Sequence, residues 1–390
     1  MKWFGPVEEA FFLDRPNRFL VHCRQGRKEI KAFLPNPGRL QELFLPGSRL
    51  LLTHQKTTPH RRYAYTVAAV EREGRPIMLH THKTNEVAAH LLERSKIPGL
   101  EGARIMGREI PVNHSRFDLL VRNNGQEILM EVKSCTLVGR HTAMFPDAVT
   151  VRGSRHLREL AALAREGRKT AVLFVVHWPK VDFFLPDYHT DLTFAQTMLE
   201  CRKDIHFFPV AVEWKEDLSL GRHVKLLTIP WKIIKQEAKD RGGYLLILRL
   251  RDPKTLTIGQ LGRITFPSGY YLYVGSAMGN LTARMERHRR LLKKMHWHID
   301  TLRTEAEFQA VLPIRSSISL ECALAEKAAQ IADWSIPNFG CSDCRCSSHL
   351  LGFSINPFQN KAFLDLVQYF RMDRLSDSLK MSQETSLKGD

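Results

Sequence analysis

Two short apolar runs joined by a turn signal constrain the fold of this chain more than any other feature of its sequence. Residues 117–122 and 127–133 are rich in β-favouring side chains, and Asn123-Asn124-Gly125 lies between them. An Asn-Gly pair flanked by such runs is a strong signal of a tight β-hairpin. We therefore predict two adjacent strands, one on each side of this turn.

Three charged residues lie near the outer ends of these predicted strands. Asp118 and Glu131 are expected at the same end of the hairpin, and Lys133, two residues further on, shares a strand face with Glu131. Two carboxylates offer oxygen ligands to a hard divalent cation, and an ammonium beside them can orient or activate a bound water. This D-x(n)-E-x-K arrangement is that of metal-dependent nucleases, so we predict a catalytic role for all three residues and Mg²⁺ or Mn²⁺ at the acidic pair. The alternative is an ordinary hairpin with solvated charges.

The charge balance indicates an anionic partner. Against 41 Asp and Glu residues the chain has 58 Lys and Arg, which gives a formal net charge of +17. A field of this sign attracts phosphate polymers or anionic membrane surfaces. No apolar run approaches the roughly 18 residues of a membrane-spanning helix, and the first residues lack the order of a signal peptide. We predict DNA as the partner, no membrane association and, from seven cysteines without an even framework, a cytoplasmic location; the oligomeric state is left open.

The pattern of the chain changes along its length and predicts a multi-domain α/β protein. Residues 1–81 are typical of a small β-barrel of the OB kind. Residues 82–228 follow the order helix, three strands, helix, strand, the core order of restriction-endonuclease-like folds. A charged linker at 229–240 leads to a separate α+β module at 241–375, and 376–390 is expected to be a flexible tail. The strands expected in the barrel are residues 18–23, 29–33, 49–54 and 63–71.

Several short motifs distinguish the first 230 residues. They are Arg15-Pro-Asn-Arg-Phe-Leu, Pro35-Asn-Pro-Gly-Arg39, Ser115-Arg-Phe-Asp118, Glu131-Val-Lys-Ser134, Phe145-Pro-Asp-Ala-Val-Thr150, Arg152-Gly153 and His156-Leu-Arg-Glu-Leu160. With these motifs the chain resembles the sugar fermentation stimulation protein family. The resemblance implies DNA binding, a suspected role in regulating maltose metabolism, and an OB barrel followed by a PD-(D/E)XK nuclease-like domain whose motif falls on Asp118, Glu131 and Lys133.

Two questions about this part of the chain stay open. Many nucleases of this type add an acidic residue from the first helix, and here Glu86, Glu93 and no equivalent are the alternatives. The protein is either a nuclease that acts on DNA or a DNA-binding regulator that uses nuclease-like folds as platforms without turnover. In both cases the side chains that we expect to contact DNA are Arg15, Arg18, Arg39, Arg116, Arg152 and Arg287.

The module from residue 241 carries its own pattern. Arg241-Gly-Gly-Tyr244 opens an apolar strand, and a second strand ends in Tyr273-Val-Gly275-Ser276. A helix is expected over 281–295, with Leu281, Met285, Leu292 and Met295 facing inward. Together with Arg287-His288, Trp297-His-Ile-Asp300 and Phe339-Gly-Cys-Ser-Asp-Cys-Arg-Cys346, this pattern resembles the GIY-YIG nuclease domain and an uncharacterised family related to it, over about residues 240–372.

The GIY-YIG resemblance implies a second catalytic site. Tyr244 and Tyr273 take the places of the two motif tyrosines, Arg284 that of the helix arginine that steadies the scissile phosphate, and His288 follows one turn later. Glu321, at the start of a predicted helix, is the candidate metal carboxylate. These residue types suit phosphodiester cleavage, and we expect them to converge on one basic cleft. The alternative is that both tyrosines pack in the core and Arg284 is solvated.

A group of soft ligands follows in the same module. Cys341, Cys344, Cys346 and His349 form a C-x2-C-x-C-x2-H cluster, which predicts a Zn²⁺ site placed behind the cleft. The alternative is free cysteines packed under a turn. Further candidate ligands for this ion are His296, His298 and Asp300.

Overall fold

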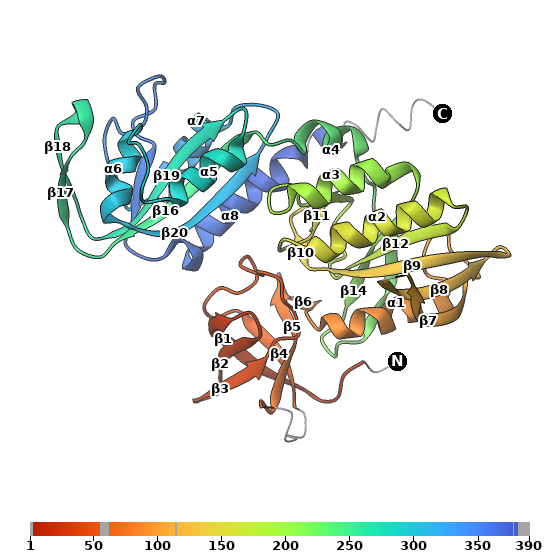
Figure 1. Cartoon of the computed structure of the whole chain (residues 1–390). Coiled ribbons are helices and arrows are strands. Elements are labelled where there is room, and N and C mark those ends of the chain that lie inside the picture. The colour runs from red at the N-terminus through yellow and green to blue at the C-terminus, as the bar shows by residue number, and fades with distance from the viewer. Residues whose placement is uncertain (1–2, 55–61, 114, 377, 381–390) are drawn as a thin grey trace. The chain divides into compact units, whose positions relative to one another are not determined.

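The computed structural model describes residues 3–54, 62–113, 115–376 and 378–380. Contacts divide the chain into two units, one of Met1–Ile234 with the chain from Leu375, and one of Lys235–Arg374 (Figure 1). None of the helices in the described residues is both long and apolar enough to cross a membrane. Of the predicted tail at 376–390, residues 377 and 381–390 lie outside the described residues.

Unit 1 begins with a closed β-barrel. Its strands are β1 (Val7–Asn17), β2 (Leu20–Gln25), β3 (Lys28–Phe33), β4 (Arg49–His54), β5 (Tyr65–Arg72) and β6 (Arg75–Met78). They pair in the order β3-β2-β1-β4-β5-β6, and a parallel pairing between β3 and β5 closes the barrel. Inward residues such as Ala10, Val21 and Leu52 are fully buried, so the barrel has a packed core.

The second domain of unit 1 is built on a mixed six-stranded sheet. Its strands are β7 (Arg104–Val112), β8 (Ser115–Asn123), β9 (Gln126–Cys135), β12 (Lys169–Val176), β14 (His206–Trp214) and β15 (Leu220–Leu226), in the order β15-β14-β12-β9-β8-β7. The predicted hairpin is β8–β9, and both Asn124 and Gly125 have the positive φ angles that a two-residue turn requires. Strand β9 pairs in parallel with β12, and β12 with β14.

Helices cover both faces of this sheet (Figure 1). Helix α1 (Thr84–Glu93) packs on one face, while α2 (Val151–Arg165) and α3 (Leu192–Glu200) pack on the other. Because side chains alternate along a strand, Met130 and Val132 join the α1 core and Glu131 faces the α2 side. A small sheet of β10 (Leu137–Val138), β11 (Thr142–Phe145) and β13 (Phe183–Pro186) completes the domain.

The start of helix α2 is fixed by a chain of caps. Thr150 is the N-cap of α2, and its side chain accepts a hydrogen bond from Gly153 N at 3.0 Å. The backbone N–H of Thr150 donates in turn to Asp191, which is itself the N-cap of α3. The N-termini of α2 and α3 are therefore tied together, which sets the position of the first turns of α2 over the sheet.

Unit 2 is an antiparallel five-stranded sheet with helices. The strands are β16 (Gly242–Leu250), β19 (Gly269–Ala277), β20 (Glu307–Arg315), β21 (Trp334–Ser335) and β22 (Leu350–Phe353), in the order β20-β16-β19-β22-β21, with a separate ribbon of β17 (Lys254–Thr257) and β18 (Arg263–Phe266). Its helices are α5 (Leu281–Arg289), α6 (His298–Glu305), α7 (Glu321–Ala329) and α8 (Lys361–Arg371). Helix α4 (Trp231–Glu237) contains the division between the two units.

The helix expected over residues 281–295 is shorter in the structure. Helix α5 ends at Arg289, and Leu292 and Met295, expected to face inward, are 96% and 45% exposed. The physical reason is Asp300, which is fully buried and draws the chain after α5 toward itself. Its carboxylate contacts Lys293 Nζ at 2.7 Å and accepts hydrogen bonds from the backbone N–H groups of residues 296 and 297.

Candidate functional site

Asp118 lies beside Glu131, one residue beyond the paired Leu119 and Met130 of the β8–β9 hairpin. Each oxygen of Asp118 is held by a different element. Oδ2 accepts a hydrogen bond from Val132 N on β9, and Oδ1 accepts one from the Asn85 side chain on α1, both at 2.7 Å. The orientation of this carboxylate is therefore fixed by the hairpin and by the first helix.

Glu131 is only 4% exposed and has two differently placed oxygens. Its Oε1 lies 2.7 Å from Nδ1 of His156 on α2 and also accepts a hydrogen bond from Lys133 Nζ. Its Oε2 is buried and has no hydrogen-bond partner among the described residues. A buried carboxylate oxygen without a partner is costly unless another ligand occupies it.

The surroundings shift the pKa values of the two carboxyl groups in opposite directions. Burial and then the charge of Glu131 raise the pKa of Asp118 to about 6, against the hydrogen bonds from Val132 and Asn85. Burial also disfavours the charged form of Glu131, but His156 and Lys133 together outweigh this and hold its pKa below the ordinary value. A divalent cation at this position would relieve the repulsion and occupy the free oxygen, so the donor set fits a hard metal ion.

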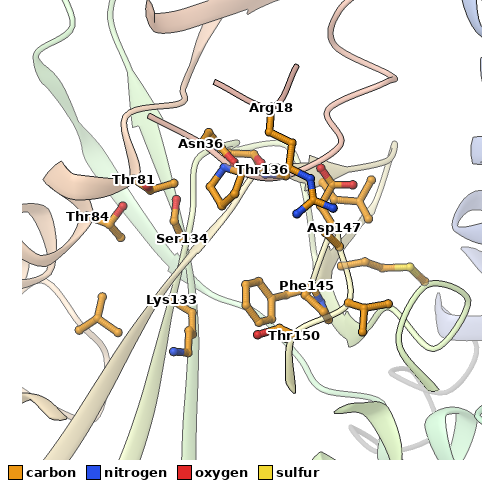
Figure 2. Close-up of a pocket in the computed structure, with 18 of the residues that line it drawn as sticks. Arg18, Asn36, Thr81, Thr84, Lys133, Ser134, Thr136, Phe145, Asp147 and Thr150 are labelled. Carbon is orange, nitrogen blue, oxygen red and sulfur yellow. Dashed lines mark hydrogen bonds between the residues drawn. The ribbon is translucent and has the colours of Figure 1, made fainter. Parts of the chain in front are cut away.

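A cleft of about 350 Å³ lies next to this pair, within unit 1. Arg18, Asn36 and Thr136 border one end, and Lys133 and Thr150 the other (Figure 2). Arg18 and Asn36 come from the barrel, whereas Lys133 comes from β9 of the second domain. The cleft therefore presents a barrel arginine and the hairpin lysine to the same space.

The predicted DNA-contacting arginines of unit 1 divide into two kinds. Arg15 is occupied, because its guanidinium donates to the backbone carbonyls of Arg39, Arg18 and Asn36 at 2.6, 2.7 and 3.1 Å. It therefore ties the turn between β1 and β2 to the segment after β3 and offers few free donors to a ligand. The side chains that remain exposed are Arg18, Arg39, Arg116 and Arg152.

The first helix contributes an amide rather than an acid to the pair. Glu86 bonds Lys83 at 3.0 and 3.1 Å, and Glu93 lies 3.8 Å from Arg108, so each of these acids is paired with a cation of its own. Asn85, between Thr84 and Glu86, makes that contact instead.

His156 is the second residue that sequence reasoning assigned no role. Its Nδ1 faces Glu131, and its Nε2 accepts a hydrogen bond from Arg152 Nε at 3.2 Å. The available signal was its presence in a motif at the start of an amphipathic helix, four residues after Arg152 and so on the same helix face. The link to Glu131 depends on how α2 packs on the sheet.

Unit 2 brings its predicted site residues together. The rings of Tyr244 and Tyr273 lie 6.3 Å apart between centroids, and the Tyr244 hydroxyl bonds Nε2 of His288 at 2.8 Å. Burial raises the pKa of both tyrosines, and both also respond to the charges of Arg284 and Glu321. The five side chains therefore share one electrostatic environment.

His288 and Arg284 of this group differ in their charge and in their contacts. Burial, followed by the charge of Lys293, lowers the pKa of His288 to about 3, so its ring is neutral near pH 7. Arg284 stacks with its guanidinium carbon 4.1 Å from the centroid of Trp297. Arg287, one of the predicted DNA contacts, donates two hydrogen bonds to the buried Asp300 at 2.9 and 2.8 Å. It therefore forms a structural ion pair with Asp300.

Both oxygens of Glu321 have neighbours. Oε2 accepts a hydrogen bond from the Ser276 hydroxyl, and Oε1 lies 3.5 Å from Nδ1 of His349. Burial raises its pKa, but His349, Ser276 and Arg284 outweigh burial, so the pKa lies below the ordinary value. Glu321 therefore has a protein neighbour at each oxygen, whereas Oε2 of Glu131 has none among the described residues.

The cysteine cluster differs from the predicted set in one member. Cys322 on α7, rather than Cys341, joins Cys344, Cys346 and His349, and their ligand atoms all lie within 4.8 Å of one another. Cys341 is buried and does not belong to the group, whereas Cys322, the second residue of α7, brings a ligand from another element.

The surroundings of the cluster also differ from the expectation. Nδ1 of His349 lies 3.5 Å from Oε1 of Glu321, so the cluster adjoins a residue of the predicted second site. Of the other candidate ligands, Asp300 pairs with Arg287 and Lys293, while His296 and His298 make ring contacts with Trp297 and Phe339 and do not belong to this group.

Three protein-family models match the chain. The SfsA N-terminal OB domain matches residues 13–79, the sugar fermentation stimulation protein RE domain residues 82–217, and a domain of unknown function, DUF123, residues 243–372. The predicted OB barrel is therefore confirmed.

Curated relatives and a solved structure agree with these matches. The sugar fermentation stimulation protein homolog of Moorella thermoacetica is 38% identical over 193 residues, 49% of this chain and 83% of the relative. That of Methanosphaera stadtmanae is 34% identical over 228 residues, 57% of this chain and 94% of the relative. The structure of Pyrococcus furiosus SfsA in complex with Ca²⁺ is 29% identical with a TM-score of 0.54, and the match covers 59% of this chain and 99% of that one. This chain belongs to the sugar fermentation stimulation protein family and carries a DUF123 domain after the family's two domains.

Proposed function

We propose that unit 1 is a metal-dependent DNA nuclease in which Asp118 and Glu131 hold Mg²⁺ or Mn²⁺. The observation that carries the proposal is the unpartnered, buried Oε2 of Glu131 next to an aspartate whose pKa is raised to about 6. A divalent cation held by both carboxylates would ligate this oxygen and relieve their mutual repulsion. The relative from Pyrococcus furiosus was solved in complex with Ca²⁺, a hard cation that prefers the same oxygen ligands.

The residues around the pair suit hydrolysis of a phosphodiester. A bound divalent cation supplies Lewis-acid polarisation of a phosphate oxygen and lowers the pKa of a bound water. His156 and Lys133 keep Glu131 ionised, so that it is available as a ligand at neutral pH. Asn85 and the N–H of Val132 hold Asp118 in one orientation, which positions the second carboxylate.

The cationic surface of the protein supports DNA as the substrate. The net charge is +17, and four of the predicted arginines of unit 1 remain exposed, one of them at the mouth of the cleft that contains Lys133. Phosphate contacts by such side chains dominate the affinity of proteins for DNA and release condensed counterions. We expect binding of DNA by unit 1 to weaken steeply as salt is raised.

The test is a cleavage assay on the full chain with duplex and single-stranded DNA. We expect cleavage with Mg²⁺ or Mn²⁺, none with a chelator, and loss of cleavage in Asp118→Asn with DNA binding retained. The matched control is Glu86→Gln, which removes an acid from α1 that bonds Lys83 and not Asp118, and which should cleave as the wild type does. DNA binding without cleavage under any divalent metal would favour the non-catalytic regulator instead.

A second candidate is a phosphodiesterase centre in unit 2 of the GIY-YIG kind. The observation that favours it is the mutual electrostatic influence of Tyr273, Arg284 and Glu321, residues from a strand and two helices. Residual cleavage by the Asp118→Asn protein would be its signature. Arg284→Ala in that background should remove the residual activity, while Arg289→Ala, which removes an exposed charge from the same helix, should not.

A further inference from the structure

Four soft ligands in unit 2 are assembled from two separate segments. Cys344, Cys346 and His349 come from the segment between β21 and β22, and Cys322 comes from the first turn of α7. Their ligand atoms lie within 4.8 Å of one another, and no disulfide links the cysteines. Three sulfur atoms and one imidazole nitrogen are the ligand set of a structural Cys₃His zinc site.

The distances suit a tetrahedral ion of the size of zinc. With Zn–S near 2.3 Å and Zn–N near 2.0 Å, the edge between a sulfur and a nitrogen ligand of a tetrahedron is about 3.5 Å. The observed separation of Cys344 Sγ and His349 Nε2 is 3.4 Å. All four ligand atoms lie within 4.8 Å of one another, so only small movements of the exposed Cys322 and the half-buried Cys344 and Cys346 are needed to reach similar separations.

The second nitrogen of His349 gives an independent sign of metal binding. His349 is 1% exposed, and its Nδ1 is buried without a hydrogen bond that meets ordinary geometry, 3.5 Å from Oε1 of Glu321. A histidine with one nitrogen in a thiol cluster and the other directed at a carboxylate has the arrangement of a carboxylate–histidine–zinc group. In such groups the carboxylate fixes the ring orientation and the tautomer of the ligand.

We propose that Cys322, Cys344, Cys346 and His349 bind one Zn²⁺ ion, with Glu321 as the positioning residue that orients His349. The ion links the start of α7 to the segment before β22 and so fixes Glu321 between Ser276 and His349. The same segment also contacts Tyr273, because a Cβ at Gly340, which has a φ of 72°, would lie 2.9 Å from the Tyr273 ring. This proposal does not depend on whether either unit cleaves DNA.

The first experiment measures the metal content of the full chain, expressed without a metal-binding tag in zinc-supplemented medium. We expect one zinc per chain by inductively coupled plasma mass spectrometry. Cys322→Ser and Cys344→Ser should lose it, whereas Cys341→Ser, the matched control outside the group, should keep it. Circular dichroism of each variant verifies that unit 1 and the bulk of the fold remain.

The second experiment tests the role of Glu321. Zinc affinity is measured by competition with a chromophoric chelator, and cobalt substitution reports tetrahedral thiolate coordination by its absorption. Glu321→Ala should weaken zinc binding by about 10- to 100-fold, and Glu321→Gln, which keeps an acceptor for the Nδ1 proton, should restore most of the affinity.

Three results would overturn the proposal. They are a wild-type chain that takes up no zinc or takes up iron in its place, a Cys322→Ser protein that binds zinc as the wild type does, and a Cys341→Ser protein that loses it. An unchanged affinity in Glu321→Ala would remove Glu321 from the site and leave the four ligands. Loss of zinc with DNA cleavage intact would separate this site from the nuclease proposed for unit 1.

Discussion

The carboxylates of the two units are buried to similar degrees but differ in how completely protein groups compensate them. In unit 1, Asp118 and Glu131 repel each other, and one oxygen of Glu131 lacks a partner. In unit 2, Asp300 is matched by Arg287 and Lys293, and Glu321 by Ser276 and His349. The comparison shows that burial of an acid does not by itself mark a cation site. The proposed cation site rests instead on a carboxylate oxygen that the described residues leave without a partner.

The largest expected effect is on DNA cleavage. Glu131→Gln should lower metal-dependent cleavage by about 100-fold or more, because the cation loses an ionised ligand. Glu321→Gln should change it less than about twofold, because Glu321 serves the cysteine cluster and not the nuclease centre. Rates under single-turnover conditions measure both. If Glu321→Gln caused the larger loss, the chemistry would belong to unit 2 and the comparison would be reversed.

The next effect is on the stability of unit 2. Asp300→Asn should cost about 3–5 kcal/mol, because it leaves the cations of Arg287 and Lys293 near a neutral buried group. Urea unfolding followed by tryptophan fluorescence measures the loss. The control is Asp365→Asn, which breaks an exposed pair with Lys361 and should cost less than about 0.5 kcal/mol. Equal losses of unfolding free energy in the two variants would show that burial does not increase the contribution of Asp300 to stability.

A smaller effect on stability, an increase in place of a decrease, is expected when Asp118 is substituted. The folded pKa is about 6 and the ordinary value 3.8, so the folded state binds this proton more tightly than the unfolded state does. The stabilisation that the folded state gains from binding this proton is complete below about pH 4 and is lost as the pH rises through 6. Asp118→Asn should therefore stabilise the metal-free protein at pH 8 by about 1–2 kcal/mol and have little effect at pH 4.

Thermal unfolding in the presence of a chelator at the two pH values checks this sign. Addition of Mg²⁺ or Ca²⁺ should stabilise the wild type and not Asp118→Asn, since a ligand that binds only the folded state adds to its stability. Destabilisation by Asp118→Asn at pH 8 would mean that its hydrogen bonds to Asn85 and Val132 outweigh the repulsion from Glu131.

Local patterns in the sequence predicted the parts of the fold and the site that depend on few residues. The β8–β9 hairpin followed from Asn124-Gly125, because positive φ at two successive positions selects these residues. Once the hairpin is fixed, the proximity of Asp118, Glu131 and Lys133 follows from the pairing register. This part of the prediction needed no knowledge of tertiary packing.

The contacts that the sequence did not reveal all cross between distant elements. His156 meets Glu131 only because α2 packs over β9, and Cys322 enters the cluster only because α7 begins beside the segment before β22. The end of α5 at Arg289 is imposed by Asp300, a buried charge that follows it in the chain. Residue type and spacing carry no signal of such packing, so the helix was expected to continue and Cys341 took the place of Cys322.

The smallest expected effect concerns how the two units share the binding of DNA. Arg116 is exposed on β8, the strand that carries Asp118, whereas Arg251 is exposed in unit 2 beside Glu307. Arg116→Ala should weaken DNA binding on the order of threefold and reduce the salt slope by about one, as expected for one lost phosphate contact. Arg251→Ala removes the same charge and should change neither quantity.

Fluorescence anisotropy over a salt series separates the outcomes, because a contact alters the slope, whereas a long-range field weakens with screening for both variants alike. Equal slopes and equal affinities for the two variants would show that the net charge of +17, and not a surface on unit 1, holds the DNA.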